Sequence, residues 1–296
     1  MTMLLAVALP KVAAIFLPYI ALALMLMLFL NFMSVDIEAI KNEIFAWQYQ
    51  LWLLFLTMIL LPILLFFAAT LLDHWLNINN DFALAILVIF ACPTATAAPT
   101  LAILFGAKLE RAILTTLTSS ILVPLSMPSL IYILVGKASH IPILTFSFYI
   151  AKIIILPFIL ALIVRRVLPA VRTKLLPTVP LASLLLLVIL IFAGASSMRS
   201  LLTEHSSLAI IGILCAASLF ILVFGLSWLL AFKKDRASKL TASLVATWTN
   251  VGLSIIITTE FFHKTNPDMI LYILMTAIVW NLAIIVAKML INKNQN

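Results

Sequence analysis

Residues 90–100 read Phe90-Ala-Cys-Pro-Thr-Ala-Thr-Ala-Ala-Pro-Thr100 inside an otherwise apolar run. Pro93 and Pro99 each remove a helix hydrogen-bond donor and clash with the preceding turn. The hydroxyls of Thr94 and Thr96 can satisfy backbone carbonyls that such a break leaves free. The stretch therefore predicts a helix that is interrupted in the middle of an apolar segment.

A second stretch has the same character and lies far along the chain. Residues 247–254 read Thr247-Trp-Thr-Asn-Val-Gly-Leu-Ser254. Asn250 and Gly252 are poor residues for the middle of a helix. We expect a second interruption here, with a pair of merely kinked helices as the alternative, because prolines and glycines are common in membrane helices.

The composition around these stretches is that of a membrane protein. Of 296 residues, 65% are hydrophobic and 9% are charged, against roughly 25% charged in an ordinary soluble domain. This composition excludes a soluble globular protein and predicts the lipid bilayer as the surrounding medium. The net charge of +8 would indicate nucleic acid in a soluble protein, but here we read the basic residues as loop markers and expect no nucleic-acid partner.

Counting apolar stretches of about 20 residues predicts an all-α polytopic protein with nine transmembrane helices and a single transporter domain over residues 1–296. Residues 1–11 are too short to span and are interpreted as an outer extension or the remnant of a first helix. The predicted spans are 12–34, 47–72, 82–105, 112–135, 144–164, 176–198, 207–232, 240–262 and 267–290.

The basic residues predict the orientation. Thirteen Lys and Arg fall in one set of alternate loops, four fall in the other, and Lys152 lies at the start of the fifth span. Because basic residues accumulate on the cytoplasmic side, the N-terminus is expected outside and the C-terminus inside. The compact loops suggest a bacterial inner membrane. Lys152 is read either as a cation that snorkels to the interface or as one that attracts an anionic substrate.

The two interrupted spans are the third and the eighth, and five crossings reverse the direction of a helix. Matched broken helices in antiparallel halves are typical of an inverted-repeat transporter, with the substrate site where they cross. The repeats are expected at about 1–136 and 144–292. Free N–H groups at half-helix N-termini would suit an anion.

The polar side chains near the two breaks are the candidate site residues. The fourth span adds Thr116 and Ser120, which share a helix face, and the last span adds Asn281, which could instead only join helices. The predicted helix-break residues are Pro93, Pro99 and Gly252. The predicted substrate-binding residues are Thr94, Thr96, Thr247, Trp248, Asn250 and Asn281.

Several motifs together resemble the bile acid:sodium symporter family. They are Cys92-Pro93-x-x-Thr96-Ala97, Pro124-Leu-x-x-Pro128, Asn250-x-Gly252-Leu253, Trp280-Asn281 and the segment Phe29-Leu-Asn-Phe-Met-Ser-Val-Asp36. The resemblance implies a core domain with two crossing broken helices, a panel domain, and alternating-access transport of a small organic anion. No cofactor is implied beyond sodium.

The positions that match the family's sodium ligands differ here. A Ser-Asn pair corresponds to Ala98 and Pro99, and a glutamate corresponds to Val245. The ion-binding residues that the resemblance still implies are Thr57, Thr116, Ser120 and Thr249. We therefore expect altered coupling: facilitated exchange, proton-linked movement, or sodium held by hydroxyls and carbonyls alone.

Other function classes stay open. A carrier of the related auxin-efflux type shares the crossed broken helices, and a non-transporting membrane sensor would tolerate the loss of ion ligands. No embedded His, Lys or Asp lies near a nucleophile at helical spacing, so we expect no enzyme activity and no catalytic residues. Cys92 and Cys215 are isolated in apolar runs and predict no metal site.

Overall fold

The first half of the chain is mainly helical in its described part. The computed structural model describes residues 2–35, 47–76, 80–136, 142–196, 198–199, 203 and 206–293. Asp36, the last residue of the family-like segment 29–36, lies outside these residues. The first-half elements are α1 (Thr2–Ala8), α2 (Pro10–Ile15), η1 (Leu17–Tyr19), α3 (Ile20–Ser34), α5 (Trp47–Phe55), the π-helix η2 (Leu56–Leu60), α6 (Leu61–Leu76), α7 (Asn80–Ala91), α8 (Ala98–Phe105) and α9 (Leu109–Val135).

The second half is built in the same way. Its elements are α10 (Ile143–Val167), α11 (Pro169–Leu175), η4 (Leu176–Thr178), α12 (Val179–Gly194), α14 (Ser206–Leu230), α15 (Arg236–Thr247), α16 (Val251–Ile257), the π-helix η5 (Thr258–Phe262) and α17 (Met269–Lys293). The only β pairing among the described residues is one bridge between Thr94 and Thr249. The prediction of an all-helical protein is confirmed.

The predicted spans coincide with helices, and their boundaries differ by a few residues. Six helical segments are long and apolar enough to cross a membrane, and three further apolar helices, at 81–91, 251–262 and 269–285, are shorter. Two of the three short helices belong to the interrupted spans. Nine crossings therefore stay a prediction, while several membrane-crossing helices are present in the described part of the chain.

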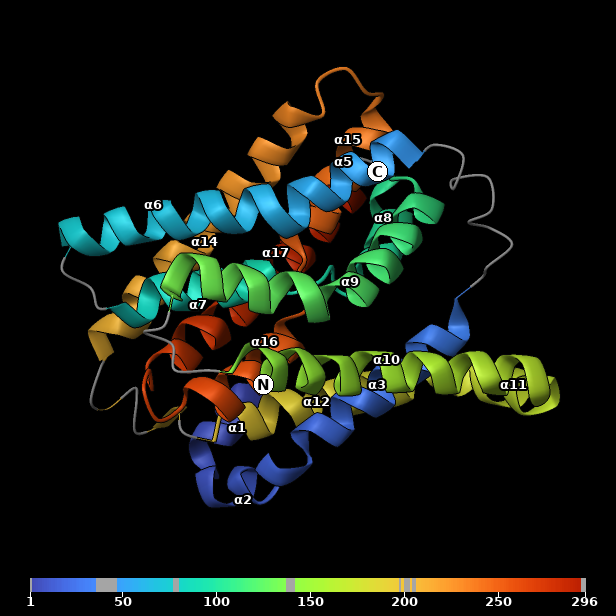
Figure 1. Ribbon diagram of the computed structural model, residues 1–296, viewed down its shortest axis with the longest axis horizontal. Coiled ribbons are helices and arrows are strands. Elements are labelled where there is room, and N and C mark those ends of the chain that lie inside the picture. Colours follow the sequence, from blue (N-terminus) through green and yellow to red (C-terminus); the bar gives the residue numbers. More distant parts are fainter. Residues whose placement is uncertain are drawn as a thin grey trace.

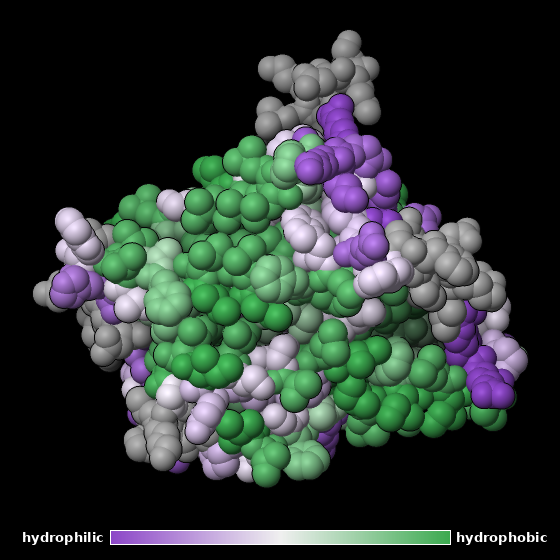
Figure 2. Space-filling model, turned by 45° about the horizontal axis from the view of Figure 1, so that its top comes forward, coloured by the Kyte–Doolittle hydropathy of each residue, from purple (hydrophilic) through white to green (hydrophobic). Residues whose placement is uncertain are grey.

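Large apolar side chains are exposed along these helices. Leu125 and Ile133 on α9 are each 72% exposed, and Phe148 on α10 is 73% exposed. Figure 2 shows hydrophobic residues covering most of one face, with hydrophilic residues gathered at one end. Water would penalise this much apolar surface, whereas lipid does not. The chain is an integral membrane protein.

The helices form two groups with the interrupted helices between them. α3 packs against α10 and α12, while α14 packs against α15 and α17, and α6 packs against α7. In Figure 1, α3, α10, α11 and α12 run together on one side, and α5, α6 and α14 lie on the other. The candidate site lies where the first group meets the interrupted helices.

Candidate functional site

The two interrupted helices meet at their breaks and complete each other's hydrogen bonding. α7 and α8 are separated by residues 92–97, and α15 and α16 by residues 248–250. The Ala95 N–H donates to the Trp248 carbonyl over 2.7 Å, and the Asn250 N–H donates to the Pro93 carbonyl over 2.8 Å. Unwound backbone within a membrane protein must find such partners. The two breaks thus form a single hydrogen-bonded unit.

Thr94 ties this crossing to two helices. Its hydroxyl donates to the Val245 carbonyl of α15 over 2.9 Å, and its N–H donates to Ser119 Oγ of α9 over 3.2 Å. Thr94 is only 2% exposed. The residue predicted to contact substrate is therefore engaged in holding the break together.

Asn250 is the N-cap of α16. Its side-chain Oδ1 accepts a hydrogen bond from the Leu253 N–H over 3.1 Å. The interpretation that this N-terminus offers free N–H groups to an anion is wrong for that donor, because the asparagine that marks the break also caps the helix. The N-terminus of α8 has no side-chain cap.

Two of the predicted helix-break residues lie within helices. Pro99 is in the first turn of α8, where a missing N–H costs nothing. Gly252 lies inside α16, and a Cβ there would be 3.2 Å from Leu190 of α12. Gly194 of α12 repeats this arrangement, because its added Cβ would be 2.6 Å from Ile255. The glycines permit close approach of α12 to α16.

Three predicted residues keep buried polar atoms without a hydrogen-bond partner within the described structure. These atoms are Thr247 Oγ1, Trp248 Nε1 and Thr249 Oγ1. The three residues are at most 7% exposed, and such groups are costly when left unsatisfied. Their chemistry would suit a bound ion, water or ligand.

A cavity of about 420 Å³ lies beside the crossing, between α3, α8, α9 and α12. Its polar lining includes Thr96 and Thr100 from the segment that starts α8, Thr116 from α9, and Asn31 from α3. Two residues predicted at separate spans, Thr96 and Thr116, therefore line the same space. Its volume suits a small molecule.

Asn31 links the α3–α12 group to the first interrupted helix across this cavity. Its Nδ2 donates to Thr96 Oγ1 over 3.2 Å, and its Oδ1 accepts from Ser183 Oγ of α12 over 3.1 Å. The sequence reasoning did not select Asn31. The available signal was an amide within the apolar run of α3, since polar residues in membrane helices commonly mark helix contacts or function.

Two arginines bind the end of α3 at the mouth of the cavity. Arg165 Nη1 donates to the Val35 carbonyl, and Arg172 Nε donates to the Met33 carbonyl over 3.0 Å. Val35 itself lines the cavity. Cations at a helix C-terminus are favourable because they oppose the helix dipole. Two guanidinium groups therefore lie beside the end of α3 that borders the cavity.

The predicted ion-binding hydroxyls of η2 and α9, and Asn281 on α17, do not gather at one place on the crossing. The hydroxyls of Thr57, Thr116 and Ser120 donate to carbonyls of their own helices over 2.8, 2.8 and 2.7 Å, which leaves lone pairs for an ion. Thr57 lies in the π-helix η2. Asn281 is exposed on α17 and donates to the Ala277 carbonyl over 2.6 Å, so the structure does not bring it to the crossing.

Each broken helix is also fastened at its start to the segment that follows the other one. Asp81 at the start of α7 accepts from Asn266 Nδ2 over 2.7 Å and from the Asp268 N–H over 3.0 Å, beyond η5. Asp235, the N-cap of α15, lies 3.2 Å from Lys108 Nζ, beyond α8. We call these two contacts the end clamps.

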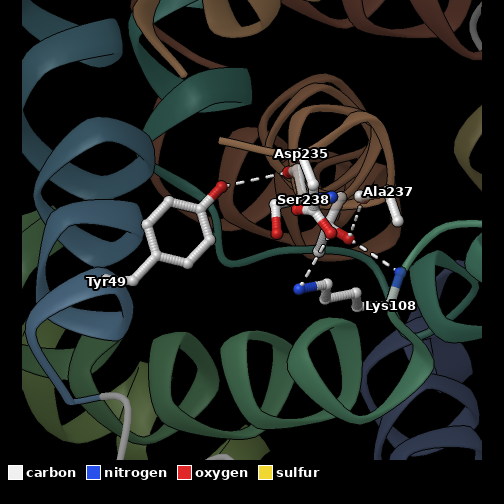
Figure 3. A network of polar contacts seen from close by, with 6 residues as sticks. Tyr49, Lys108, Asp235, Ala237 and Ser238 are labelled. Atoms are coloured by element: carbon white, nitrogen blue, oxygen red, sulfur yellow. Dashed lines mark hydrogen bonds and ion pairs between the residues drawn. The ribbon is translucent and has the colours of Figure 1, made fainter. Parts of the chain in front are cut away.

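Figure 3 shows the second end clamp and its neighbours. The Tyr49 hydroxyl donates to the Ser238 carbonyl over 3.0 Å, and the Lys108 N–H donates to Thr241 Oγ1 over 2.9 Å. Hydrogen bonds from Ser238 and then from Lys108 lower the pKa of Asp235. The carboxylate thus stays ionised at neutral pH and joins the segment after α8 to the start of α15, while Tyr49 joins α5 to α15.

The comparisons with known proteins identify the family of the chain. The sequence profile of the Sodium Bile acid symporter family matches residues 21–205, more than half of the chain. The match includes α3, the first broken helix, α9 and α12, and ends before the second broken helix. A search of the curated proteins gives no match. The chain belongs to the sodium bile acid symporter family.

Proposed function

We propose that the protein is a secondary transporter that carries a small organic anion by alternating access. The observation that carries this proposal is the cavity of about 420 Å³ beside the crossing of two interrupted helices. A polar cavity at such a crossing is where inverted-repeat transporters bind substrate. Family membership supports transport as the class of activity.

The proposed moving parts are the α3–α10–α12 group, as the panel, and the interrupted helices with their neighbours, as the core. Asn31 is the polar link between them at the cavity, and neutral hydrogen bonds of this kind stabilise a contact by only about 1 kcal/mol. Gly194 and Gly252 each lie against a side chain of the other helix, so α12 and α16 pack closely. A weak polar link is suited to repeated opening.

The end clamps support an inverted repeat as the basis of the core. Each broken helix starts with an aspartate that binds the segment after the other broken helix. Two antiparallel repeats would produce this reciprocal pattern. In this proposal the core moves as one body, because the crossing and both clamps fix the two broken helices to each other.

An anionic substrate is favoured by the polarity of the cavity. The start of α8 borders it through Thr100, and Thr96 just before α8 borders it too; a helix N-terminus carries partial positive charge. Arg165 and Arg172 add two cations beside the end of α3. The described lining residues are neutral, so among them a carboxylate or sulfonate would meet hydroxyl and amide donors and no opposing negative charge.

The proposed coupling differs from sodium symport that relies on a buried carboxylate. Val245 occupies the position of the family's glutamate and is fully buried within α15. The candidate oxygens that remain are hydroxyls at Thr57, Thr116, Ser120 and Thr249. Neutral oxygens offer a cation less electrostatic stabilisation than a carboxylate does. We therefore propose that sodium accelerates transport weakly or not at all.

The proposed orientation places this cavity on the cytoplasmic side, because it lies at the C-terminal end of α3 and at the starts of α9 and α12. The protein would then be in its inward-facing state, in a bacterial inner membrane with the N-terminus outside. Uptake and efflux use the same states, and the auxin-efflux type of function differs only in net direction. Adding substrate to either side of oriented vesicles distinguishes the two.

The test is uptake of radiolabelled organic anions into proteoliposomes. Thr96→Val removes a hydroxyl from the cavity, and its matched control is Thr173→Val on the exposed side of α11. We expect Thr96→Val to raise KM several-fold while Thr173→Val leaves uptake unchanged. Equal kinetics for the two variants would contradict the placement of substrate in this cavity, and no saturable flux for any anion would contradict transport.

A further inference from the structure

A second cavity, of about 230 Å³, lies between the start of α5 and the turn that follows α14. Gln48, Tyr49 and Trp52 line it from α5, and residues 230–234 line it from the other side. α5 packs mainly against α9, whereas α14 packs mainly against α15 and α17. A gap between two helices at the membrane surface is filled by lipid, because an empty space forfeits dispersion contacts on both sides.

The walls of this cavity are aromatic and lie where the apolar run of α14 ends. Tyr49 and Trp52 stack with ring centroids 5.4 Å apart and an interplanar angle of 8°. Phe232 on the opposite side is 67% exposed. Tyrosine and tryptophan gather at the level of lipid headgroups, so the cavity is placed where a headgroup and the first acyl carbons lie.

Two lysines stand at its mouth. Lys234 Nζ lies 4.6 Å from the centre of the Tyr49 ring, and Lys233 Nζ lies 5.5 Å from that of Phe232. Backbone hydrogen bonds from Lys234 to Ala231 and from Phe232 to Leu229 fix the turn that presents them. Within the described residues, no carboxylate lies within ion-pair distance of either lysine. The pair therefore offers two positive charges to an external anion.

The apolar surface continues from the cavity along both helices. Leu51 and Phe55 on α5 are 55% and 48% exposed, and Leu229 on α14 is 68% exposed. A ligand with an anionic head and an apolar tail matches a surface that passes from two lysines, past aromatic rings, to exposed apolar side chains. Basic pockets between membrane helices bind anionic headgroups for this reason.

We propose that this cavity binds an anionic phospholipid, with Lys233 and Lys234 at the phosphate, the Tyr49–Trp52 stack against the glycerol region, and the acyl chains along α5 and α14. The bound lipid would join two helices that otherwise pack against different neighbours. Tyr49 also donates to the Ser238 carbonyl at the second end clamp, so the lipid would reinforce that end of the core. This site is separate from the transport cavity.

The experiment measures lipid binding and thermal stability of the full-length protein in detergent, with phosphatidylglycerol, phosphatidylcholine or soluble glycerol phosphate added. We expect phosphatidylglycerol to raise the melting temperature more than phosphatidylcholine does. The double variant Lys233→Gln/Lys234→Gln should weaken phosphatidylglycerol binding about 25-fold, at about fivefold per lysine. Native mass spectrometry counts the lipids that remain bound.

The matched control is Arg166→Gln/Lys174→Gln, which removes the same charge from exposed positions on α10 and α11. It should keep the phosphatidylglycerol preference, as should the charge-preserving variant Lys233→Arg/Lys234→Arg. Because the arginine variant retains both positive charges, it provides a reading even if the glutamine variant fails to fold. Equal losses in the glutamine variant and the control would overturn the proposal. Equal protection by glycerol phosphate would assign the site to a soluble phosphate and would overturn it as well.

Discussion

Replacement of Thr94 by valine tests how the first break is held. In an unbroken helix the Val245 carbonyl would accept from the N–H four residues later, at Thr249. That N–H donates instead to the Thr247 carbonyl over 3.1 Å. The Thr94 hydroxyl takes its place at 2.9 Å, so valine would leave a buried carbonyl without its donor.

The expected cost is about 1–3 kcal/mol, the penalty for a buried polar group that loses its partner. The shape of the side chain is nearly unchanged, so packing contributes little. Thr94→Ser keeps the hydroxyl and should recover most of the loss. Thr70→Val is the matched control, because Thr70 is exposed on α6 and its hydroxyl only returns to its own helix; we expect a change within about 0.5 kcal/mol there.

The assay is reversible unfolding in mixed detergent micelles, followed by uptake with the surviving protein. The reasoning predicts a stability order of wild type, Thr70→Val, Thr94→Ser and Thr94→Val, with the last clearly separated. The reasoning is refuted if Thr94→Val and Thr70→Val have the same free energy of unfolding. That result would mean that the Val245 carbonyl needs no donor from the other broken helix.

Further perturbations test the cavity, the contact between α12 and α16, the second end clamp and the ion coupling. Asn31→Asp should lower uptake of an anion more than Asn31→Ala does, because it also adds negative charge; equal kinetics would contradict this. Gly194→Ala places a Cβ 2.6 Å from a side chain of α16. It should lower the transport turnover per folded molecule more than it lowers the yield of folded protein. The pKa of Asp235 is lowered in the folded protein, so the ionised carboxylate adds to the free energy of unfolding, by at most about 1 kcal/mol. This contribution should be complete above the ordinary pKa of 3.8 and should be lost as the pH falls through the lower pKa of the folded protein. Asp235→Asn should remove that step from the pH–stability profile. Val245→Glu should introduce stabilisation by sodium over potassium, and identical melting curves in the two salts would count against the ion-site interpretation.

The sequence predicted the breaks because proline and asparagine act locally. Pro93 and Asn250 stand in short stretches that gather several helix-disfavouring and hydroxyl residues, so both interruptions could be found without knowing the fold. A proline by itself is not sufficient, because α9 continues through Pro124 and Pro128. The pairing of Thr94 with Thr249 could not be found in this way, because it depends on the register of two segments about 150 residues apart. The same limit applies to Asn31, whose partners are Thr96 in the first break and Ser183 on α12.

The position of Asn281 illustrates a second limit. α17 is apolar on all sides, so no periodic pattern indicates which face meets the protein. The structure turns Trp280 inward against Phe90, with ring centroids 5.8 Å apart, and leaves Asn281 exposed. Asn250 differs because its capping role follows from the break itself. Gly252 was read as a break, but its lack of a side chain serves helix packing, which sequence alone does not distinguish.

The central claim is that this family member moves a small organic anion through the cavity beside Asn31 and Thr96 without a strict requirement for sodium. The most direct measurement is the initial rate of anion uptake into proteoliposomes, with sodium replaced by potassium at constant ionic strength and Thr96→Val as the specificity control. The account predicts saturable uptake that Thr96→Val weakens and that changes little when sodium is removed. Saturable uptake that disappears without sodium would contradict it.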